Sequence, residues 1–366
     1  MMKLPITLSF YIGRQFLFSC IIVLSVFLTL LAVIDAMELI RRSYGKEMPV
    51  GVMMEMVLLK LPYLAQELIP FIVLLGGILA FSRLTRTSEL VVARAAGISV
   101  WQFLMPAIVV SFVLGVFLVT VFNPLSSVML KRYEQLENKY LRGDTSMMTV
   151  SESGLWLRQK NGESGGKTVI YASSVSQEDM SLHDVTVFVF ADQDVFIQRI
   201  DAEHAILKDG YWKLENASIT APDKMAEKHA YYFIKTTIRQ NQIQESFASP
   251  ETLSFWELPS FIKTLKASGF SALRHRLYWH SVLSVPIFLC AMVYIAAAFS
   301  LTPPRKGKTG MLIVGGIGVG FFIHFTSGLV SALGIAGSIP IMLAAWAPVV
   351  ISMLLGIVLM LHLEDG

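Results

Sequence analysis

The chain has 366 residues, of which 54% are hydrophobic and 16% are charged, and its formal net charge is +3. Ordinary soluble domains carry roughly 25% charged residues, so this composition argues against a soluble enzyme. The small net charge gives no support to nucleic-acid binding. The charges are unevenly spread, because 37 of the 57 Asp, Glu, Lys and Arg residues lie between Asn123 and Arg276. We therefore expect a polar domain set inside a membrane protein.

A helix needs about 20 consecutive apolar residues to cross the hydrocarbon core of a bilayer. The clearest uncharged stretches are Phe16–Ile34, Trp101–Phe122, Leu277–Leu301 and Thr309–Leu361. The last is long enough for two spans, with a turn expected at 334–340, where Gly and Pro gather. A further span ends at Ser82 and has to begin near Leu61, because the uncharged stretch from Leu68 is too short. The sequence thus predicts six transmembrane helices, three on each side of the polar domain.

Basic residues in the short connections predict the orientation, because connections rich in Lys and Arg stay in the cytoplasm. One side of the membrane would hold eight: Lys3, Arg14, Arg83, Arg86, Arg94, Arg305, Lys306 and Lys308. The other side would hold four: Arg41, Arg42, Lys46 and Lys60. We expect a multi-pass protein with both termini in the cytoplasm and the polar domain outside.

The polar domain is expected to be all-β and jelly-roll-like. Residues 126–141 continue the third span as a helix, and short strands separated by turn signals follow. The expected strands include the alternating pairs Leu155/Leu157 and Val169/Tyr171, and then the runs 185–190, 196–207, 211–219 and 231–238. Asp209-Gly210 favours a hairpin turn, and residues 254–269 form an amphipathic helix. The expected domains are an N-terminal transmembrane half at 1–124, the β domain with flanking helices at 125–270, and a C-terminal transmembrane half at 271–366.

Several motifs have a simple structural interpretation. Gly307-Lys308-Thr309 is similar to the end of a phosphate-binding loop, but Thr302 stands where that motif needs a glycine, so a basic cytoplasmic loop is favoured. The spacing of Gly316 and Gly320 favours close packing of membrane helices. His280 and His324 lie within spans, where function and simple packing are both open. We predict no catalytic site, no metal site and no cofactor.

The connection after the second span is expected to contain a short amphipathic helix at about 86–97, on the cytoplasmic side. Thr87 or Ser88 can cap this helix, and Gly97 can end it. One interpretation is a connector lying on the membrane surface, and the other is a docking helix for a cytoplasmic motor subunit. The candidate coupling residues in the second case are Arg86, Glu89 and Arg94.

The segment Ser88-Glu89-Leu90-Val91-Val92, followed by Ala95-Ala96-Gly97, resembles the coupling segment of the lipopolysaccharide-export permease family, LptF/LptG. The resemblance extends to Pro70, Leu74-Leu75-Gly76-Gly77, Gly154-Leu155-Trp156 and the stretch 263–269, and it covers essentially the whole chain. The pattern is most similar to the LptG branch. One departure is Asp35, which stands where that branch has a lysine.

This resemblance implies one transmembrane subunit of an ABC-type exporter, which extracts lipopolysaccharide from the bacterial inner membrane and passes it to a periplasmic bridge. The implied partners are a cytoplasmic ATPase dimer (LptB-like), a sister permease (LptF-like) and a periplasmic β-jellyroll bridge protein (LptC-like). ATP would be hydrolysed in the separate subunit, so this chain is not expected to be an enzyme.

The phosphates of lipopolysaccharide make Arg41, Arg42 and Lys46 candidate substrate contacts, because arginine binds phosphate bidentately. The alternative is that Arg41 and Arg42 pair with Glu38 or contact anionic lipid headgroups. For the whole chain, the alternative function is a membrane-anchored envelope scaffold or sensor, whose β domain binds a partner without transport.

Overall fold

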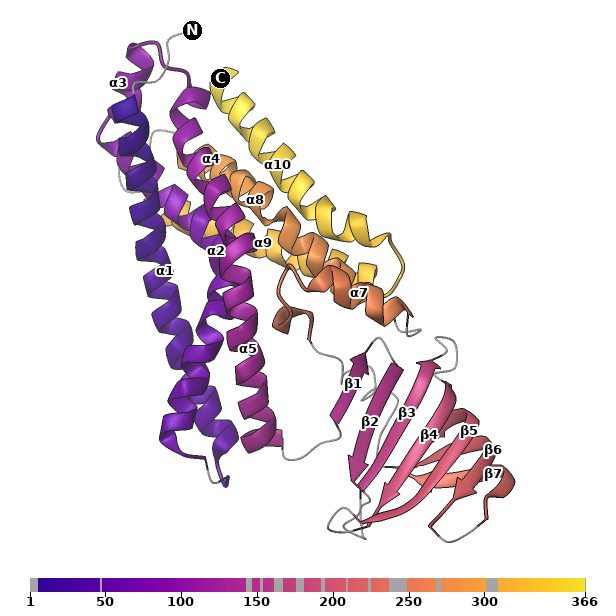
Figure 1. Cartoon of the computed structure of the whole chain (residues 1–366). Coiled ribbons are helices and arrows are strands. Elements are labelled where there is room, and N and C mark those ends of the chain that lie inside the picture. The colour runs from indigo at the N-terminus through magenta and orange to yellow at the C-terminus, as the bar shows by residue number, and fades with distance from the viewer. Residues whose placement is uncertain are drawn as a thin grey trace. The chain divides into compact units, whose positions relative to one another are not determined.

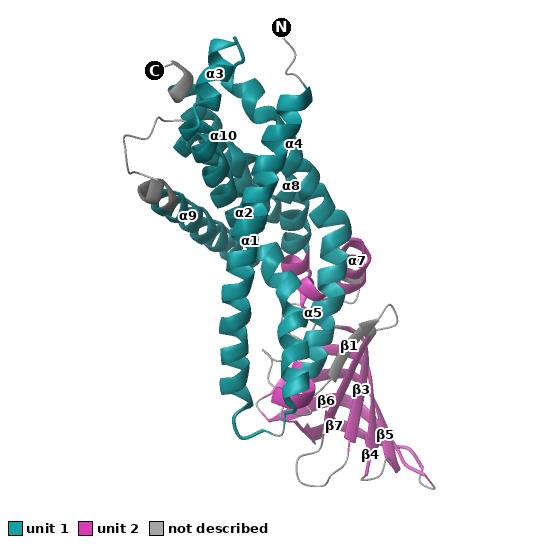
Figure 2. Cartoon of the chain, turned by 90° about the vertical axis from the view of Figure 1, so that its left-hand side faces the viewer, with its two compact units in different colours: residues 1–136, 276–366 teal, residues 137–275 magenta. Residues whose placement is uncertain are grey.

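The computed structural model describes residues 6–46, 48–142, 147–151, 154–160, 167–175, 181–191, 195–208, 210–222, 225–236, 249–267, 271–300 and 309–365. The chain divides into two compact units, one made of residues 1–136 and 276–366 and the other of residues 137–275 (Figure 2). We call them the membrane unit and the β unit. The basic loop with Arg305, Lys306 and Lys308 lies outside the described residues, as does Asp209 of the predicted hairpin turn.

Six helices of the membrane unit are long and apolar enough to cross a membrane, which confirms the predicted spans. In chain order they are α1 (Ile6–Ser43), α2 (Val50–Arg86), α4 (Val100–Phe117) with its continuation, α8 (Leu273–Ser300), α9 (Thr309–Ile335) and α10 (Ile341–Asp365). A seven-residue helix, α3 (Glu89–Ala95), joins α2 to α4. It lies at the same end of the unit as the beginning of α1 and the end of α10 (Figure 1).

The second helix is longer than the sequence pattern predicted, since it begins at Val50 rather than near Leu61. Pro49 precedes it in an extended conformation, and Pro62 and Pro70 lie inside it. The turns before Leu61 are mostly apolar, and Met56 and Val57 are buried there. Glu55 lies on the exposed side and pairs with Arg132 at 3.7 Å.

The third span continues without a break through a π-helical stretch, η1 (Leu118–Phe122), into α5 (Asn123–Glu137) and a second such stretch, η2 (Asn138–Arg142). This confirms the predicted helix beyond Ser126. Pro124 has no backbone N–H to donate, and a π-helical turn is a common way to absorb such an interruption. Thr120 donates its hydroxyl to the carbonyl of Val116 at 2.8 Å within the same turn.

Glycines mark the places where the spans approach each other most closely. A Cβ added to Gly76 of α2 would lie 2.8 Å from the Cα of Cys20 in α1, and one added to Gly115 of α4 would lie 2.4 Å from the Cα of Pro286 in α8. At Gly316 and Gly320 of α9, added Cβ atoms would lie 2.2 Å and 2.9 Å from side chains of α2. The packing role predicted for the α9 glycines is therefore confirmed.

The β unit contains one antiparallel sheet of seven strands in chain order. They are β1 (Met147–Ser151), β2 (Gly154–Lys160), β3 (Lys167–Val175), β4 (Leu182–Phe190), β5 (Phe196–Lys208), β6 (Tyr211–Thr220) and β7 (Glu227–Lys235). The predicted all-β insert is confirmed. The described strands pair with their sequence neighbours as a meander, without the crossovers of a Greek key. Lys208 pairs with Tyr211, which confirms the predicted hairpin.

One face of the sheet carries the apolar core of the β unit. The buried residues there include Leu157, Val187, Ile200 and Trp212. In β3 the predicted phase was wrong, because Ile170 is buried whereas Val169 and Tyr171 are partly exposed. Their neighbours Thr168 and Ala172 are also buried, so a pattern of polar alternation misassigned this strand.

The core face remains apolar on both sides of a bend in the middle of the sheet. Asp184 in β4 and Asn216 in β6 have positive φ angles of 48° and 54°. Asp and Asn tolerate this left-handed conformation better than most residues. Glu203 lies between them in β5 and accepts a hydrogen bond from the Asn216 side chain at 2.7 Å. The alternation of buried and exposed residues changes phase at this level in all three strands, while their pairing register is the same on both sides.

A helix after the sheet, α7 (Leu258–Ala267), packs on the same core, as its amphipathic pattern predicted. Leu265 is buried there, and Phe261 and Ile262 pack against the core. The helix is preceded by a short turn of 3-10 helix, η4 (Pro250–Thr252). Ser254 and Glu257 exchange side-chain to backbone hydrogen bonds, which is the arrangement of a capping box.

Candidate functional site

The short helix α3 is anchored on one side and open on the other. Leu90 and Ala93 are buried in the core of the membrane unit, whereas Val91 and Val92 are 62% and 67% exposed. The helix ends in a turn at Gly97, whose φ of +81° suits glycine. Val91 and Val92 therefore form a small apolar patch on the outer side of α3.

The Glu89 carboxylate, at the beginning of α3, is held by hydrogen bonds from other residues of this chain. It accepts a hydrogen bond from the Thr87 hydroxyl at 2.8 Å and another from the Tyr11 hydroxyl of α1 at 3.2 Å. The predicted side-chain cap is wrong, because Ser88 takes the capping position with a φ of 61° and makes no cap hydrogen bond with its side chain. The Thr87 hydroxyl, which has one hydrogen to donate, is closest to Glu89 and also lies within hydrogen-bond distance of carbonyls at the end of α2. The first turn of α3 is therefore tied to α1 as well as to α2.

Of the other two candidate coupling residues, Arg86 ends α2 and Arg94 lies in the last turn of α3, and both are exposed. The end of α2 that carries α3 is also joined to α8. Thr85 donates its hydroxyl to the carbonyl of Ser300 at 3.1 Å, and Ser300 donates to the carbonyl of Ile78 at 3.3 Å. A displacement of α3 would therefore act on the packing of α1, α2 and α8.

At the opposite end of the membrane unit, a buried ion pair joins the first two spans. Lys60 of α2 donates a hydrogen bond to Asp35 of α1, and Asp35 is 7% exposed. The Lys60 ammonium also lies over the ring of Tyr133 in α5, 5.3 Å from its centroid. Asp35 Oδ2 is buried and has no hydrogen-bond partner among the described residues. The sequence showed both charges, but it could not show that residues 25 positions apart pair across two helices.

The three predicted substrate contacts lie just beyond this pair. Arg41 and Arg42 are in the last turn of α1, and Lys46 is in the turn that follows, where its N–H donates to the carbonyl of Ser43. Arg41 and Lys46 are exposed, and Arg42 is partly exposed. The sequence at this end of α1 therefore concentrates positive charge where the helix leaves the apolar region.

Between these two ends, α2 is more deeply buried than its neighbours α1 and α9. It packs against both α1 and α9. In the most apolar stretch of each helix, 61% of α2 is buried inside the protein, compared with 17% of α1 and 17% of α9. The exposed residues of α1 and α9 are large and apolar, including Ile21, Leu30, Phe321 and Phe325. These faces suit contact with lipid or with another membrane helix.

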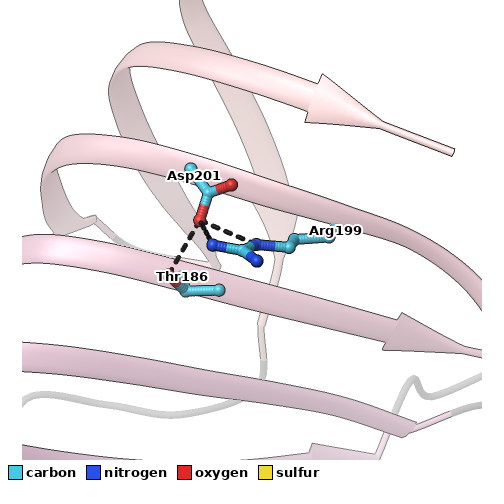
Figure 3. Close-up of polar contacts among 3 residues, drawn as sticks. All are labelled: Thr186, Arg199 and Asp201. Carbon is cyan, nitrogen blue, oxygen red and sulfur yellow. Dashed lines mark hydrogen bonds and ion pairs between the residues drawn. The ribbon is translucent and has the colours of Figure 1, made fainter. Parts of the chain in front are cut away.

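The polar face of the β unit carries small hydrogen-bonded groups and no concentrated charge. In one of them, Asp201 of β5 accepts hydrogen bonds from Thr186 of β4 at 2.8 Å and from Arg199 at 2.8 Å and 3.0 Å (Figure 3). Arg199 is exposed and Asp201 is partly exposed, and a pair near the surface adds little stability. This cluster organises the outer face of the sheet and carries no chemistry of its own.

The last described strand, β7, has exposed aromatic side chains at the end of the sheet. Tyr231 and Phe233 are 57% and 58% exposed. Lys213 of β6 lies over the Tyr231 ring, 4.3 Å from its centroid, and a hydrogen bond to Glu215 raises the pKa of Lys213. Among the described strands β7 pairs with β6 alone, so its outer edge can accept another strand.

A family model described as lipopolysaccharide export system permease LptF/LptG matches residues 10–362. The chain belongs to this family. It is also 24% identical over 357 residues to the lipopolysaccharide export system permease protein LptG of Escherichia coli strain K12, covering 92% of this chain and 93% of that protein. The LptG protein of Haemophilus influenzae is 23% identical over 356 residues, covering 93% and 94%.

Membership of the LptF/LptG family confirms the resemblance found in the sequence and identifies the chain as a multi-pass permease of lipopolysaccharide export. The match to LptF/LptG includes all six spans and the β unit, so both ends of the membrane unit described above fall within the family's shared region. Asp35 and Lys60 lie in that region too.

Proposed function

We propose that this chain is one transmembrane subunit of an ABC-type exporter that extracts lipopolysaccharide from the bacterial inner membrane and passes it to a periplasmic bridge protein. The observation that carries this proposal is α3, a helix fixed by buried Leu90 and Ala93 that presents Val91 and Val92 outward. A scaffold or sensor would have no use for such a helix between two spans. Family membership gives the transported lipid.

The energy would come from a separate ATPase dimer that binds at α3. The exposed valines would fill a groove on the ATPase, and Arg86 and Arg94 would add polar contacts at its rim. Glu89 would act indirectly, by holding the start of α3 through its hydrogen bonds with Thr87 and Tyr11. Movement of the ATPase would then reach α2 and α8 through Thr85 and Ser300.

The substrate would contact the opposite end of the membrane unit. Arg41, Arg42 and Lys46 would bind phosphates of the lipid headgroup, while acyl chains would lie against the exposed apolar faces of α1 and α9. These faces would form one side of a lipid-binding cavity, and a sister permease would form the other side. The apolar interior of the β unit would then open to receive the acyl chains, and the unit would meet a β-jellyroll bridge protein by strand addition at an open edge.

The distribution of basic residues favours an orientation with both termini and α3 in the cytoplasm and the β unit in the periplasm. Single cysteines at Val195 of the β unit and Ala96 after α3 provide a matched pair, because both positions are exposed. A membrane-impermeant thiol reagent added to intact cells should label the first and spare the second. The reverse pattern would contradict the orientation.

Purification of the tagged full-length chain in mild detergent tests the central claim. An ATPase subunit and a second permease should co-purify with it, and Val92→Asp should remove the ATPase while leaving the second permease bound. Val195→Asp, an equal change at an exposed position of the β unit, is the control. A chain that purifies without an ATPase but with a periplasmic β protein would favour the scaffold function instead.

A further inference from the structure

Glu67 of α2 is a charged side chain inside a membrane span that the mechanism described so far does not use. It lies sixteen positions before Arg83 at the cytoplasmic end, which corresponds to about 24 Å along a helix. It lies two turns, or about 10 Å, from Lys60 toward that end. Between Glu67 and Arg83, α2 has no charged residue. The carboxylate is therefore well inside the apolar part of the helix.

The Glu67 side chain is exposed in this chain and makes no ion pair with any described residue. The Tyr63 hydroxyl donates a hydrogen bond to it at 3.4 Å. A carboxylate facing acyl chains is costly, so ionisable groups in spans face a wet cavity or a partner. The exposed face of α2 at Glu67 is accordingly a cavity wall or a subunit interface.

Helix α9 packs closely against α2 at the level of Phe71. Lys60, Tyr63, Glu67 and Phe71 follow at helical spacing along one face of α2. Phe71 is closely approached by Gly320 of α9, and its ring lies 5.6 Å from that of His324. Glu67 is one turn farther along, just beyond the point where the two helices close together.

The order of groups along this face is therefore a cation, a phenol, a carboxylate and then an apolar seam. The basic residues at the end of α1 attract phosphate, whereas the charge of Lys60 is balanced by Asp35. Glu67 repels it, with no described cation to neutralise the carboxylate. Specificity often depends on such a repulsive element as well as on attractive contacts.

We propose that Glu67 is a specificity-determining residue of the lipid-binding wall, which excludes anionic headgroups from the level below Lys60. A broad sugar headgroup with its phosphates stays at the outer level, where the basic residues lie, and its acyl chains pass below. An anionic glycerophospholipid has a headgroup narrow enough to slip deeper, and there its phosphate meets the carboxylate. The inference rests on the proposed function, because it assumes that this wall binds lipid.

The test compares two lipids on the purified complex of the full-length chain. The complex is equilibrated with nanodiscs containing equal amounts of lipopolysaccharide and dioleoyl phosphatidylglycerol, recovered in detergent, and its bound lipids are quantified by mass spectrometry. Glu67→Gln should raise the ratio of bound phosphatidylglycerol to lipopolysaccharide about tenfold, because like charges a few ångströms apart in a partly desolvated site repel strongly. Glu67→Lys should raise the ratio further.

Glu55→Gln is the matched control, since it removes the same charge from an exposed position of the same helix. It should leave the ratio unchanged. If both Glu67 variants also keep the wild-type ratio while lipopolysaccharide still binds, the inference is overturned. If the variants lose the second permease at an unchanged lipid ratio, Glu67 is an interface residue and the inference is likewise overturned. Failure of the wild-type complex to bind lipopolysaccharide would overturn the proposed function as well.

Discussion

Lys60 donates a hydrogen bond to Asp35 across the contact between the first two spans, and the carboxylate that it meets is almost fully buried. Removing one partner of a buried ion pair leaves the other charge uncompensated, which is more harmful than never having had the pair. The pair therefore fixes the register of α1 against α2 at the end where the basic residues gather.

We expect Asp35→Asn and Lys60→Met each to lower the stability of the purified protein, by roughly 3 kcal/mol. Thermal unfolding in detergent, followed by intrinsic fluorescence, measures the change. The exchanged double variant Asp35→Lys/Lys60→Asp restores the pair in reverse and should recover part of the loss. A double variant as unstable as the sum of the single ones would show that the two charges do not act as a pair.

The hydrogen bond from Tyr11 to Glu89 leads to a second prediction. Glu89→Ala should weaken binding of the ATPase, because the start of α3 loses its contacts with α1 and Thr87. Tyr11→Phe removes only the contact with α1 and should reproduce part of the effect, on the order of a few-fold. The fraction of ATPase that co-purifies with each variant is the measurement. Full loss in Glu89→Ala with no change in Tyr11→Phe would instead indicate direct contact between Glu89 and the ATPase.

The basic residues at the end of α1 lead to a third prediction. Charge reversal at both Arg41 and Arg42 should reduce the amount of lipopolysaccharide bound to the purified complex, while the ATPase stays attached at the far end of the membrane unit. Lys131→Glu, an exposed charge reversal in α5, is the control. Equal lipid loading in the double variant and the wild type would reject the role given to these arginines.

The alternation in β4 allows a test with adjacent positions. Val187 is buried on the apolar face, and its neighbour Thr186 lies on the opposite face, hydrogen-bonded to Asp201. A photo-crosslinking residue at Val187 should capture lipopolysaccharide in active membranes, whereas the same residue at Thr186 should not. Lipid adducts of equal yield from the two positions would argue against passage over the apolar face.

Helix packing gives a fifth prediction, with a control in another span. A Cβ at Gly115 would lie 2.4 Å from the backbone of Pro286, whereas one at Gly318 would meet nothing within 4 Å. Gly115→Ala should destabilise the protein by about 1–3 kcal/mol, since backbone atoms have to separate. Gly318→Ala should be neutral. Melting temperatures in detergent distinguish the two, and equal values would mean that α4 and α8 can separate freely.

The sequence was sufficient for the architecture because each element carries its own local signal. Uncharged runs defined the spans, and alternating residues with turn signals defined most strands. Two local predictions were wrong. In β3 both faces carry apolar residues, so the alternation pattern predicted the wrong buried face. Ser88 has a left-handed backbone conformation, which no sequence pattern indicates. The bend at Asp184 and Asn216 was missed for the same reason.

The sequence predicted the location of the candidate sites but not the contacts that hold them together. The exposed helix α3 and the basic end of α1 are local features, and both could be located. Contacts between distant residues could not, because no residue type at Tyr11 or Ser300 indicates a partner in another helix. These two residues bond to positions 78 and 215 residues away.

The two prolines inside α2 have a mechanical consequence. Each lacks the N–H that would bond to the carbonyl four residues earlier, so the backbone is softest around Pro62 and Pro70. Glu67 lies between them. The helix can therefore bend between one arm that carries α3 and another arm that carries Lys60. A push on the first arm can tilt it while Lys60 stays bonded to Asp35, so the two ends of one helix can move at different moments of a transport cycle.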